Sequence, residues 1–208
     1  MSVRVIVFDF GNVIGFFSRR RAAEQLAAYG PPGLSIEELM RFIFFTDLEP
    51  AFESGRLTGS HVLAELRKTF GLVGTDDQLG LAHADMFTPN QAVCDLIPQL
   101  AGRYTLALLS NTNELHYRQF RGQFAGVLDS FDRLFVSHEM GLRKPDPAIY
   151  HHVSDWANVA PSECVFVDDL PENVEAARAC GWHGIVYRAE DDLAAALRAL
   201  GVETGEKS

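Results

Sequence analysis

Five short apolar runs recur along the chain, and each is bounded by polar or turn-forming residues. The runs are rich in β-branched and aromatic residues, and hydrophobic positions follow one another with little alternation. Such continuous runs are typical of strands that are buried on both faces of a sheet. The pattern predicts strands over residues 3–8, 105–109, 133–136, 164–167 and 184–187.

Helical patterns separate the later strands. Residues 171–180, PENVEAARAC, begin with proline in the first turn and are followed by glycine, as helices often are. Alternating strands and helices predict a parallel sheet with right-handed crossovers. The expected fold class is therefore α/β, with a Rossmann-like parallel sheet core.

The region between the first and second strands departs from this alternation. No convincing strand occurs over about residues 17–88, whereas helices are predicted over 18–29, from a capping box at 35–38, over 58–70 and over 75–87. This is far more helix than one crossover requires. We therefore predict an all-helical cap domain, residues 16–88, inserted into a core domain of residues 1–15 and 89–208.

Composition narrows the expected class of protein. The chain has 208 residues, 47% of them hydrophobic, and a formal net charge of -10, which argues against a nucleic-acid partner but allows small anionic substrates. Three cysteines without CxxC spacing are typical of reduced thiols, and the sequence has neither a membrane-spanning segment nor a signal-peptide pattern. We expect a cytoplasmic protein without membrane partners. The pattern leaves the oligomeric state open.

Polar residues directly follow four of the predicted strands or lie in the loop after them. In an open parallel sheet, ligands bind at the carboxyl ends of the strands, so these side chains are expected to meet. They are a carboxylate, a hydroxyl beside an amide, a lysine and two adjacent carboxylates: Asp9, Ser110, Asn111, Lys144, Asp168 and Asp169.

These residue types together predict phosphate chemistry. Three neighbouring carboxylates repel one another, and a hard cation such as Mg²⁺, which prefers oxygen ligands, relieves that repulsion. Lys144 and Ser110 add positive charge and a hydrogen-bond donor, and a helix expected to begin near Asn111 offers free N–H groups to an anion. A carboxylate that faces a phosphoryl group held in this way can attack it and form an aspartyl phosphate.

Four segments, DFGNV, LLSNTN, GLRKPDPAIY and VFVDDLPENVEAA, resemble the four motifs of the haloacid dehalogenase-like hydrolases, in order and at suitable spacing. The resemblance covers the whole chain and includes a helical cap after the first motif, with an FESG stretch at residues 52–55. Within the family, the chain is similar to the helical-cap phosphatases that act on glucose 1-phosphate and to the amino-terminal phosphatase lobe of epoxide hydrolases.

The resemblance implies a Mg²⁺-dependent phosphatase for a small phosphorylated metabolite, such as a sugar with an anomeric phosphate. It implies that Asp9 is the nucleophile and that Lys144 assists catalysis. Mg²⁺ is expected to bind to Asp9, the backbone carbonyl of Gly11 and Asp169, with Asp168 close by or joined through water. Phosphate is expected to bind to Ser110, Asn111 and Lys144.

One position departs from the family pattern. Most phosphatases of this family carry a second aspartate two residues after the nucleophile, where this chain has Gly11. A positioned acid–base group contributes about 10²–10⁴-fold in rate. We expect a cap residue (Glu49, Glu53 or His61), water or a substrate with a good leaving group to replace it.

Two other functions remain open at this stage. One is a module that binds a phosphorylated ligand or a protein with little turnover. The other is a 2-haloacid dehalogenase, against which the Asp168-Asp169 pair counts, because dehalogenases need no metal and usually lack that pair.

Overall fold

The computed structural model of the chain describes residues 2–205. Within them, five parallel strands form a sheet in the order β5-β4-β1-β6-β7. All five predicted strands are confirmed, with ends that differ by no more than two residues. They are β1 (Val5–Phe8), β4 (Thr105–Ser110), β5 (Arg133–Val136), β6 (Cys164–Asp168) and β7 (His183–Val186).

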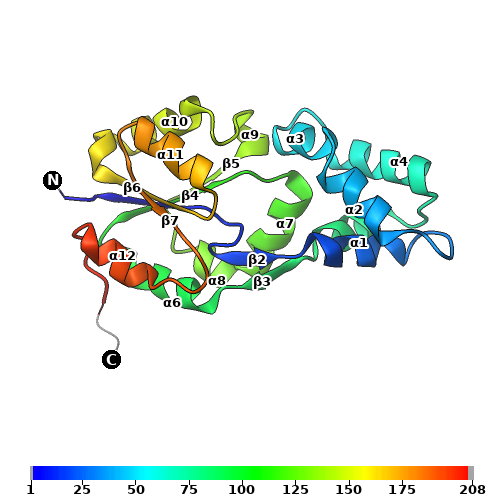
Figure 1. Ribbon diagram of the computed structural model, residues 1–208, viewed down its shortest axis with the longest axis horizontal. Helices are drawn as coiled ribbons and strands as arrows, with labels where there is room; N and C mark the ends of the chain where they lie inside the picture. Colours follow the sequence, from blue (N-terminus) through cyan, green and yellow to red (C-terminus); the bar gives the residue numbers. More distant parts are fainter. Residues whose placement is uncertain (1, 206–208) are drawn as a thin grey trace.

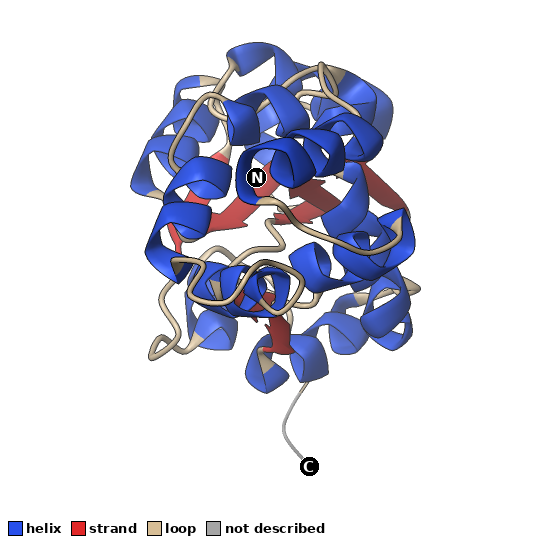
Figure 2. Cartoon of the chain, turned by 90° about the vertical axis from the view of Figure 1, so that its right-hand side faces the viewer, coloured by secondary structure: helices blue, strands red, loops and turns tan. Residues whose placement is uncertain are grey.

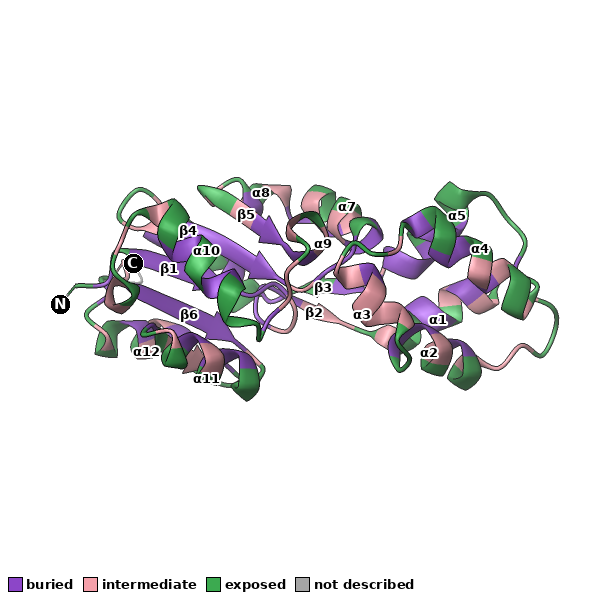
Figure 3. Cartoon of the chain, turned by 90° about the horizontal axis from the view of Figure 1, so that it is seen from above, coloured by how far each residue is buried: buried purple, intermediate pink, exposed green. Residues whose placement is uncertain are grey.

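The central strand β1 explains why the apolar runs are continuous. Its Ile6 and Phe8 pack into one core cluster, and its Val5 and Val7 pack into a second cluster on the other face. Figure 3 shows β1, β4 and β6 buried along their lengths, whereas the outward faces of the helices are exposed. Both faces of the central strands are therefore buried, as the sequence pattern indicates, whereas the edge strands β5 and β7 are partly exposed.

Helices cover both faces of the sheet (Figure 1). On one face lie α10 (Pro147–Ala157) and α11 (Pro171–Ala179), and on the other lie α6 (Gln91–Leu100) and α12 (Leu193–Ala199). Figure 2 shows the strands between these helical layers. The remaining core helices are α7 (Glu114–Gln123), α8 (Ala125–Leu128), α9 (Ser137–Met140) and a 3-10 turn, Pro161–Glu163.

The segment between β1 and β4 carries a run of helices that lies to the right of the sheet in Figure 1. They are α1 (Arg19–Ala27), α2 (Ile36–Phe44), α3 (Leu48–Glu53), α4 (Gly59–Phe70) and α5 (Asp76–Ala84). Side chains of Ser18, Ser35, Thr58 and Thr75 accept hydrogen bonds from first-turn N–H groups, which fixes where four of the helices begin. Only Thr75 with Gln78 forms both halves of a capping box; at Ser35 the serine half alone is present.

A short antiparallel ladder joins the two ends of this helical segment. It pairs β2 (Gly15–Phe17) with β3 (Phe87–Pro89), so that Phe17 lies opposite Phe87. Neither strand was predicted from the sequence, and the helix predicted over 75–87 is wrong at its end because α5 stops at Ala84. Three-residue strands that pair across such a sequence separation leave no local periodicity to detect. Among the described residues, no helix combines the length and the apolar character needed to cross a membrane.

Candidate active site

The structure brings the three predicted carboxylates together at the carboxyl edge of the sheet. Asp9 follows β1, Asp168 ends β6, and Asp169 comes next in the chain. One oxygen of each carboxylate lies within 4.8 Å of the others, which is close enough for a single cation to contact all three side chains. Parallel pairing of β1 with β6 places these residues at the same height, as the sequence analysis expected.

Lys144 lies between two of these carboxylates. Its Nζ is 2.7 Å from Asp9 Oδ1 and 2.7 Å from Asp168 Oδ2, and its side chain is buried. Burial alone lowers the pKa of a lysine, but the charges of Asp168 and Asp9 outweigh burial and raise the pKa of Lys144 above its usual value. The group is therefore a fixed ammonium that orients one oxygen of Asp9.

Asp168 is held on every side. Asn173 Nδ2 lies 3.1 and 3.0 Å from its two oxygens, and the Leu170 N–H donates to Oδ1 at 2.8 Å. With Lys144 on Oδ2, little of the carboxylate is left for a metal. This arrangement favours a positioning role for Asp168 and assigns Asn173 to holding it in place.

The remaining carboxylates fit a divalent cation. Burial raises the pKa of Asp9 to about 7 in spite of Lys144, and burial raises the pKa of Asp169 although Asn12 Nδ2 donates to it at 2.9 Å. Three carboxylates with one ammonium lack positive charge, and a cation would supply it. Asp9 and Asp169 offer free oxygens, as the prediction requires. Asn12 is a further residue of the site that was not predicted from the sequence. Its backbone has a positive φ of 54°, which asparagine adopts more readily than most residues.

Two of the three predicted phosphate-binding residues, Ser110 and Asn111, lie at the end of β4. Ser110 is its last residue and is buried. The Asn111 side chain is occupied by the lysine loop, because its Nδ2 donates to the Lys144 carbonyl and its Oδ1 accepts from the Lys144 N–H, both at 2.9 Å. The Asn111 side chain therefore holds the backbone of Lys144 in place. The group of Asn111 that is left to bind an anion is its backbone N–H.

A cavity of about 70 Å³ opens beside Gly11, between the strand ends and the helical segment. The lining includes Gly11, Ser110, Asn111, Arg19, Glu49 and Glu53. Two of the three acids proposed as replacements for the missing aspartate thus reach this space. His61, an exposed residue of α4, is not part of the lining.

The space beside Gly11 is partly filled by an aromatic ring. A Cβ added to Gly11 would lie 3.1 Å from Phe17 Cε1, which is tighter than ordinary van der Waals contact. The ring therefore lies against the place where the side chain of the family's second aspartate would begin, and it would have to shift by a few tenths of an ångström to admit that side chain. Gly11 and Phe17 together crowd this position.

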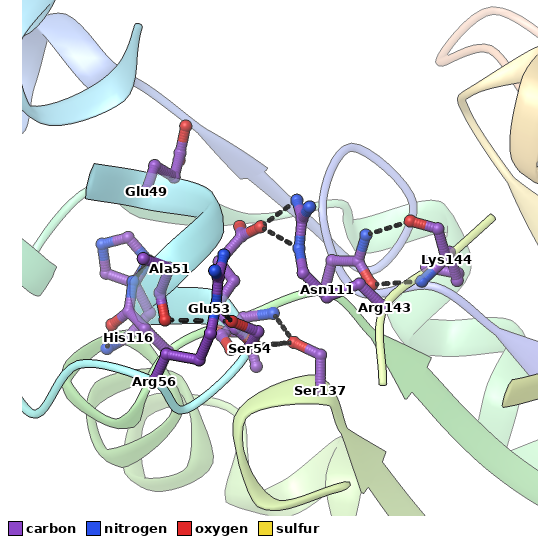
Figure 4. A network of polar contacts seen from close by, with 12 residues as sticks. Glu49, Ala51, Glu53, Ser54, Arg56, Asn111, His116, Ser137, Arg143 and Lys144 are labelled. Atoms are coloured by element: carbon purple, nitrogen blue, oxygen red, sulfur yellow. Dashed lines mark hydrogen bonds and ion pairs between the residues drawn. The ribbon is translucent and has the colours of Figure 1, made fainter. Parts of the chain in front are cut away.

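A polar network ties α3 to the core (Figure 4). Arg143 Nε and Nη2 lie 3.0 and 2.5 Å from Glu53 Oε2, and the Ser137 hydroxyl is 2.5 Å from the Glu53 carbonyl oxygen. Ser137 also accepts from the Thr112 N–H at 2.9 Å. Ser137 and Arg143 could not be predicted from local patterns, because both act through tertiary contacts.

The model of the family of haloacid dehalogenase-like hydrolases matches residues 3–181. The chain belongs to this family. The family prediction made from the four motifs is therefore confirmed. The sheet order and the helices on both faces are the haloacid dehalogenase-like form of the α/β fold.

Three comparisons place the chain among relatives. It is 27% identical to D-ribitol-5-phosphate phosphatase of Bacteroides thetaiotaomicron, over 86% of this chain and 89% of the relative. It is 30% identical to mouse bifunctional epoxide hydrolase 2, over 99% of this chain but 39% of that longer protein. A solved structure of a haloacid dehalogenase family enzyme from B. thetaiotaomicron, in complex with magnesium and inorganic phosphate, superposes with a TM-score of 0.81 at 26% identity, covering 95% of this chain and 100% of that one.

Proposed function

We propose that this chain is a magnesium-dependent phosphatase that hydrolyses a small phosphomonoester through an aspartyl phosphate on Asp9. The observation that carries the proposal is the position of the Lys144 ammonium, 2.7 Å from both Asp9 and Asp168. A carboxylate able to act as a nucleophile, a fixed positive charge and oxygen donors suited to a metal thus lie close together, which supports the proposal. The phosphatase relatives and the magnesium and phosphate complex of a family member support the same function.

Asp9, Asp169 and the Gly11 carbonyl are the groups that would hold Mg²⁺, which supplies charge stabilisation to a transferring phosphoryl group. Lys144 binds Asp9 Oδ1 and leaves the other oxygen, Oδ2, to attack phosphorus. The bond from phosphorus to the leaving oxygen then breaks, and the Ser110 hydroxyl and the Asn111 N–H hold the phosphoryl oxygens. Water next cleaves the aspartyl phosphate and restores Asp9.

We further propose that residues 16–88 act as a cap domain that sets substrate size. The β2-β3 ladder brackets this segment, and α3 supplies Arg143-bound Glu53 as well as Glu49 to the cavity. A small space with two carboxyl groups and one guanidinium, that of Arg19, suits a hydroxylated substrate. A phosphorylated sugar or polyol fits this chemistry, including a sugar with an anomeric phosphate, and one relative is named for ribitol 5-phosphate.

The proposal is tested by phosphate release from p-nitrophenyl phosphate with and without magnesium. Wild-type enzyme should release phosphate only when magnesium is present. Asp9→Asn should lose at least about 10³-fold in rate, because the amide is a poor nucleophile. Wild-type turnover in Asp9→Asn would place the nucleophile elsewhere, and no turnover of any phosphate ester by the wild type would favour a binding module.

A further inference from the structure

Hydrolysis of a phosphate ester with a poor leaving group requires a proton for the leaving oxygen, and among the described core residues the Gly11 position offers no side-chain donor. Gly11 has no side chain, and the Phe17 ring occupies the adjoining space. The position of a Cβ on Gly11 is only 3.9 Å from Asp9 Oδ2, so this wall of the cavity borders the attacking oxygen. A protein side chain that donates this proton would therefore have to come from another part of the same cavity.

Helix α3 brings two carboxyl groups to this cavity, and they are held very differently. Glu53 is tied to Arg143 by two close contacts, at 3.0 and 2.5 Å. Glu49 lies about one turn earlier, and its nearest cation is Arg19, whose Nη2 is 3.9 Å away. Within residues 2–205 its carboxyl group forms no hydrogen bond, and no dashed line reaches it in Figure 4.

The surroundings of Glu49 favour a proton on its carboxyl group. Burial is the largest cause and the negative charge of Glu53 the next, and together they raise the pKa of Glu49 to about 7 although Arg19 and Arg143 act in the opposite direction. Only 18% of the side chain is exposed. A carboxylic acid with this pKa can give and take a proton near neutral pH.

The two histidines near α3 are poorer candidates. His83 of α5 shares an apolar recess with Glu49, and His116 of α7 lines the cavity. Burial lowers the pKa of His83 to about 4 and lowers the pKa of His116 well below its usual value. Both rings are therefore neutral, and neither is an acid at neutral pH.

We propose that Glu49, supplied by the helical cap segment, is the general acid–base catalyst that replaces the aspartate missing at Gly11. This inference rests on the proposed phosphatase function. It moves the proton-transfer group from the core to α3 and leaves the nucleophile in the core. Glu53, which is fixed by Arg143, then holds α3 against the core so that Glu49 keeps its place.

The proton balance closes over one turnover. As Asp9 Oδ2 bonds to phosphorus, the bond to the leaving oxygen breaks, and the carboxyl proton of Glu49 passes to that oxygen. Glu49 is then a carboxylate. In the second step it takes a proton from water as the water oxygen attacks phosphorus, which releases phosphate and restores Asp9 and protonated Glu49.

The test compares two substrates of nearly the same shape, phenyl phosphate and p-nitrophenyl phosphate, in single-turnover reactions with magnesium. Phenolate is the poorer leaving group and needs the proton, whereas p-nitrophenolate leaves without it. Glu49→Gln keeps the shape of the side chain and removes the acid. We expect it to slow the first release of phenol by about 10²-fold and to change the first release of p-nitrophenolate by less than about threefold.

Two further variants separate proton transfer from loss of structure. Glu53→Gln breaks the contact with Arg143 and should slow both substrates by the same factor, because it loosens α3 as a whole. Glu37→Gln, on the exposed surface of α2, should leave both rates unchanged. Equal slowing of both substrates in Glu49→Gln would overturn the proposal, as would wild-type rates on both. A magnesium-dependent burst of p-nitrophenolate in the wild type would still support the phosphatase function in either case.

Discussion

Two groups of charged side chains, one on the core beside the cavity and one on α3, are built in opposite ways. On the core side, Asp9, Asp168 and Lys144 form a buried chain of ion pairs that Asn111 and Asn173 brace from outside. On the α3 side and within the described residues, Glu49 has a single ion-pair partner, Arg19 at 3.9 Å, and no hydrogen bond. The core thus fixes the groups that we propose to hold phosphate, whereas the proposed cap segment carries a group whose protonation can change.

This contrast gives a physical reason for the glycine in the first motif. The core side is densely paired, so an acid placed there would lie among three carboxylates and beside a fixed ammonium. An acid on α3 is held away from that network, and its pKa is set by burial and by Glu53. The same separation would let changes in the cap alter the leaving group without disturbing phosphate transfer.

The largest expected effect is on the core side, at Lys144. Lys144→Met leaves Asp9 and Asp168 buried without their counter-charge, and such a loss costs about 3–5 kcal/mol. Without added magnesium, chemical denaturation should show this fall in the free energy of unfolding. The exposed Lys68→Met is the matched control and should change it by less than about 0.5 kcal/mol. A small effect at Lys144 would contradict the picture of a rigid, charge-paired core.

The next effect concerns pH and the α3 side. Glu49 must be protonated to donate, so raising the pH through about 7 should lower kcat/KM for phenyl phosphate, by about tenfold per pH unit once Glu49 is ionised. The profile for p-nitrophenyl phosphate should lack this fall, because its leaving group needs no proton. Glu49→Gln should lack the fall with both substrates. If the alkaline fall with phenyl phosphate persists in Glu49→Gln, another group titrates.

Magnesium affinity should depend on the core side alone. Asp169→Asn removes a charged donor, and we expect at least about tenfold weaker magnesium binding by calorimetric titration. Glu49→Gln should bind magnesium as the wild type does, because Glu49 is not among the clustered carboxylates. If both variants weakened magnesium binding equally, the charge of Glu49 would contribute to the metal site, and the separation between core and α3 would be wrong.

A smaller effect is expected when the acid is moved back to the core. Gly11→Asp alone is crowded by Phe17, so it should gain little and lose about 1–3 kcal/mol of stability. In a Glu49→Gln background, Gly11→Asp with Phe17→Ala should recover about tenfold on phenyl phosphate relative to Glu49→Gln with Phe17→Ala. No recovery would show that room beside Gly11 is not what excludes an acid there.

The sequence predicted the core side much better than the cap side. Continuous apolar runs followed at once by Asp9, Ser110 or Asp168 located the strand ends, because parallel pairing carries chain order directly into space. The role of Asn111 as a brace for Lys144 could not be read in this way, since it depends on a contact between loops. The sequence offered no reason to prefer Glu49, Glu53 or His61 as the acid. Only their packing in the structure distinguishes the three residues.

The same limit explains the missed ladder and the missed ties of α3. Phe17 of β2 pairs with Phe87 of β3, at the other end of the helical segment. The Ser137 hydroxyl of α9 donates to the Glu53 carbonyl of α3. Each contact is made by a short stretch without periodicity of its own. Local patterns therefore predicted that helices exist between the first two strands of the core, but not how they close over the site.

The most direct test of the account is to look for the phosphoryl group on Asp9. Glu49→Gln mixed with p-nitrophenyl phosphate and magnesium should form the aspartyl phosphate and hydrolyse it slowly, because the base for the second step is missing. Acid quenching and mass spectrometry of peptides should then find one phosphoryl group on the peptide that contains Asp9, and none in Asp9→Asn. Release of p-nitrophenolate with no phosphoryl group on that peptide at any time would contradict both the nucleophile and the division of labour between core and cap.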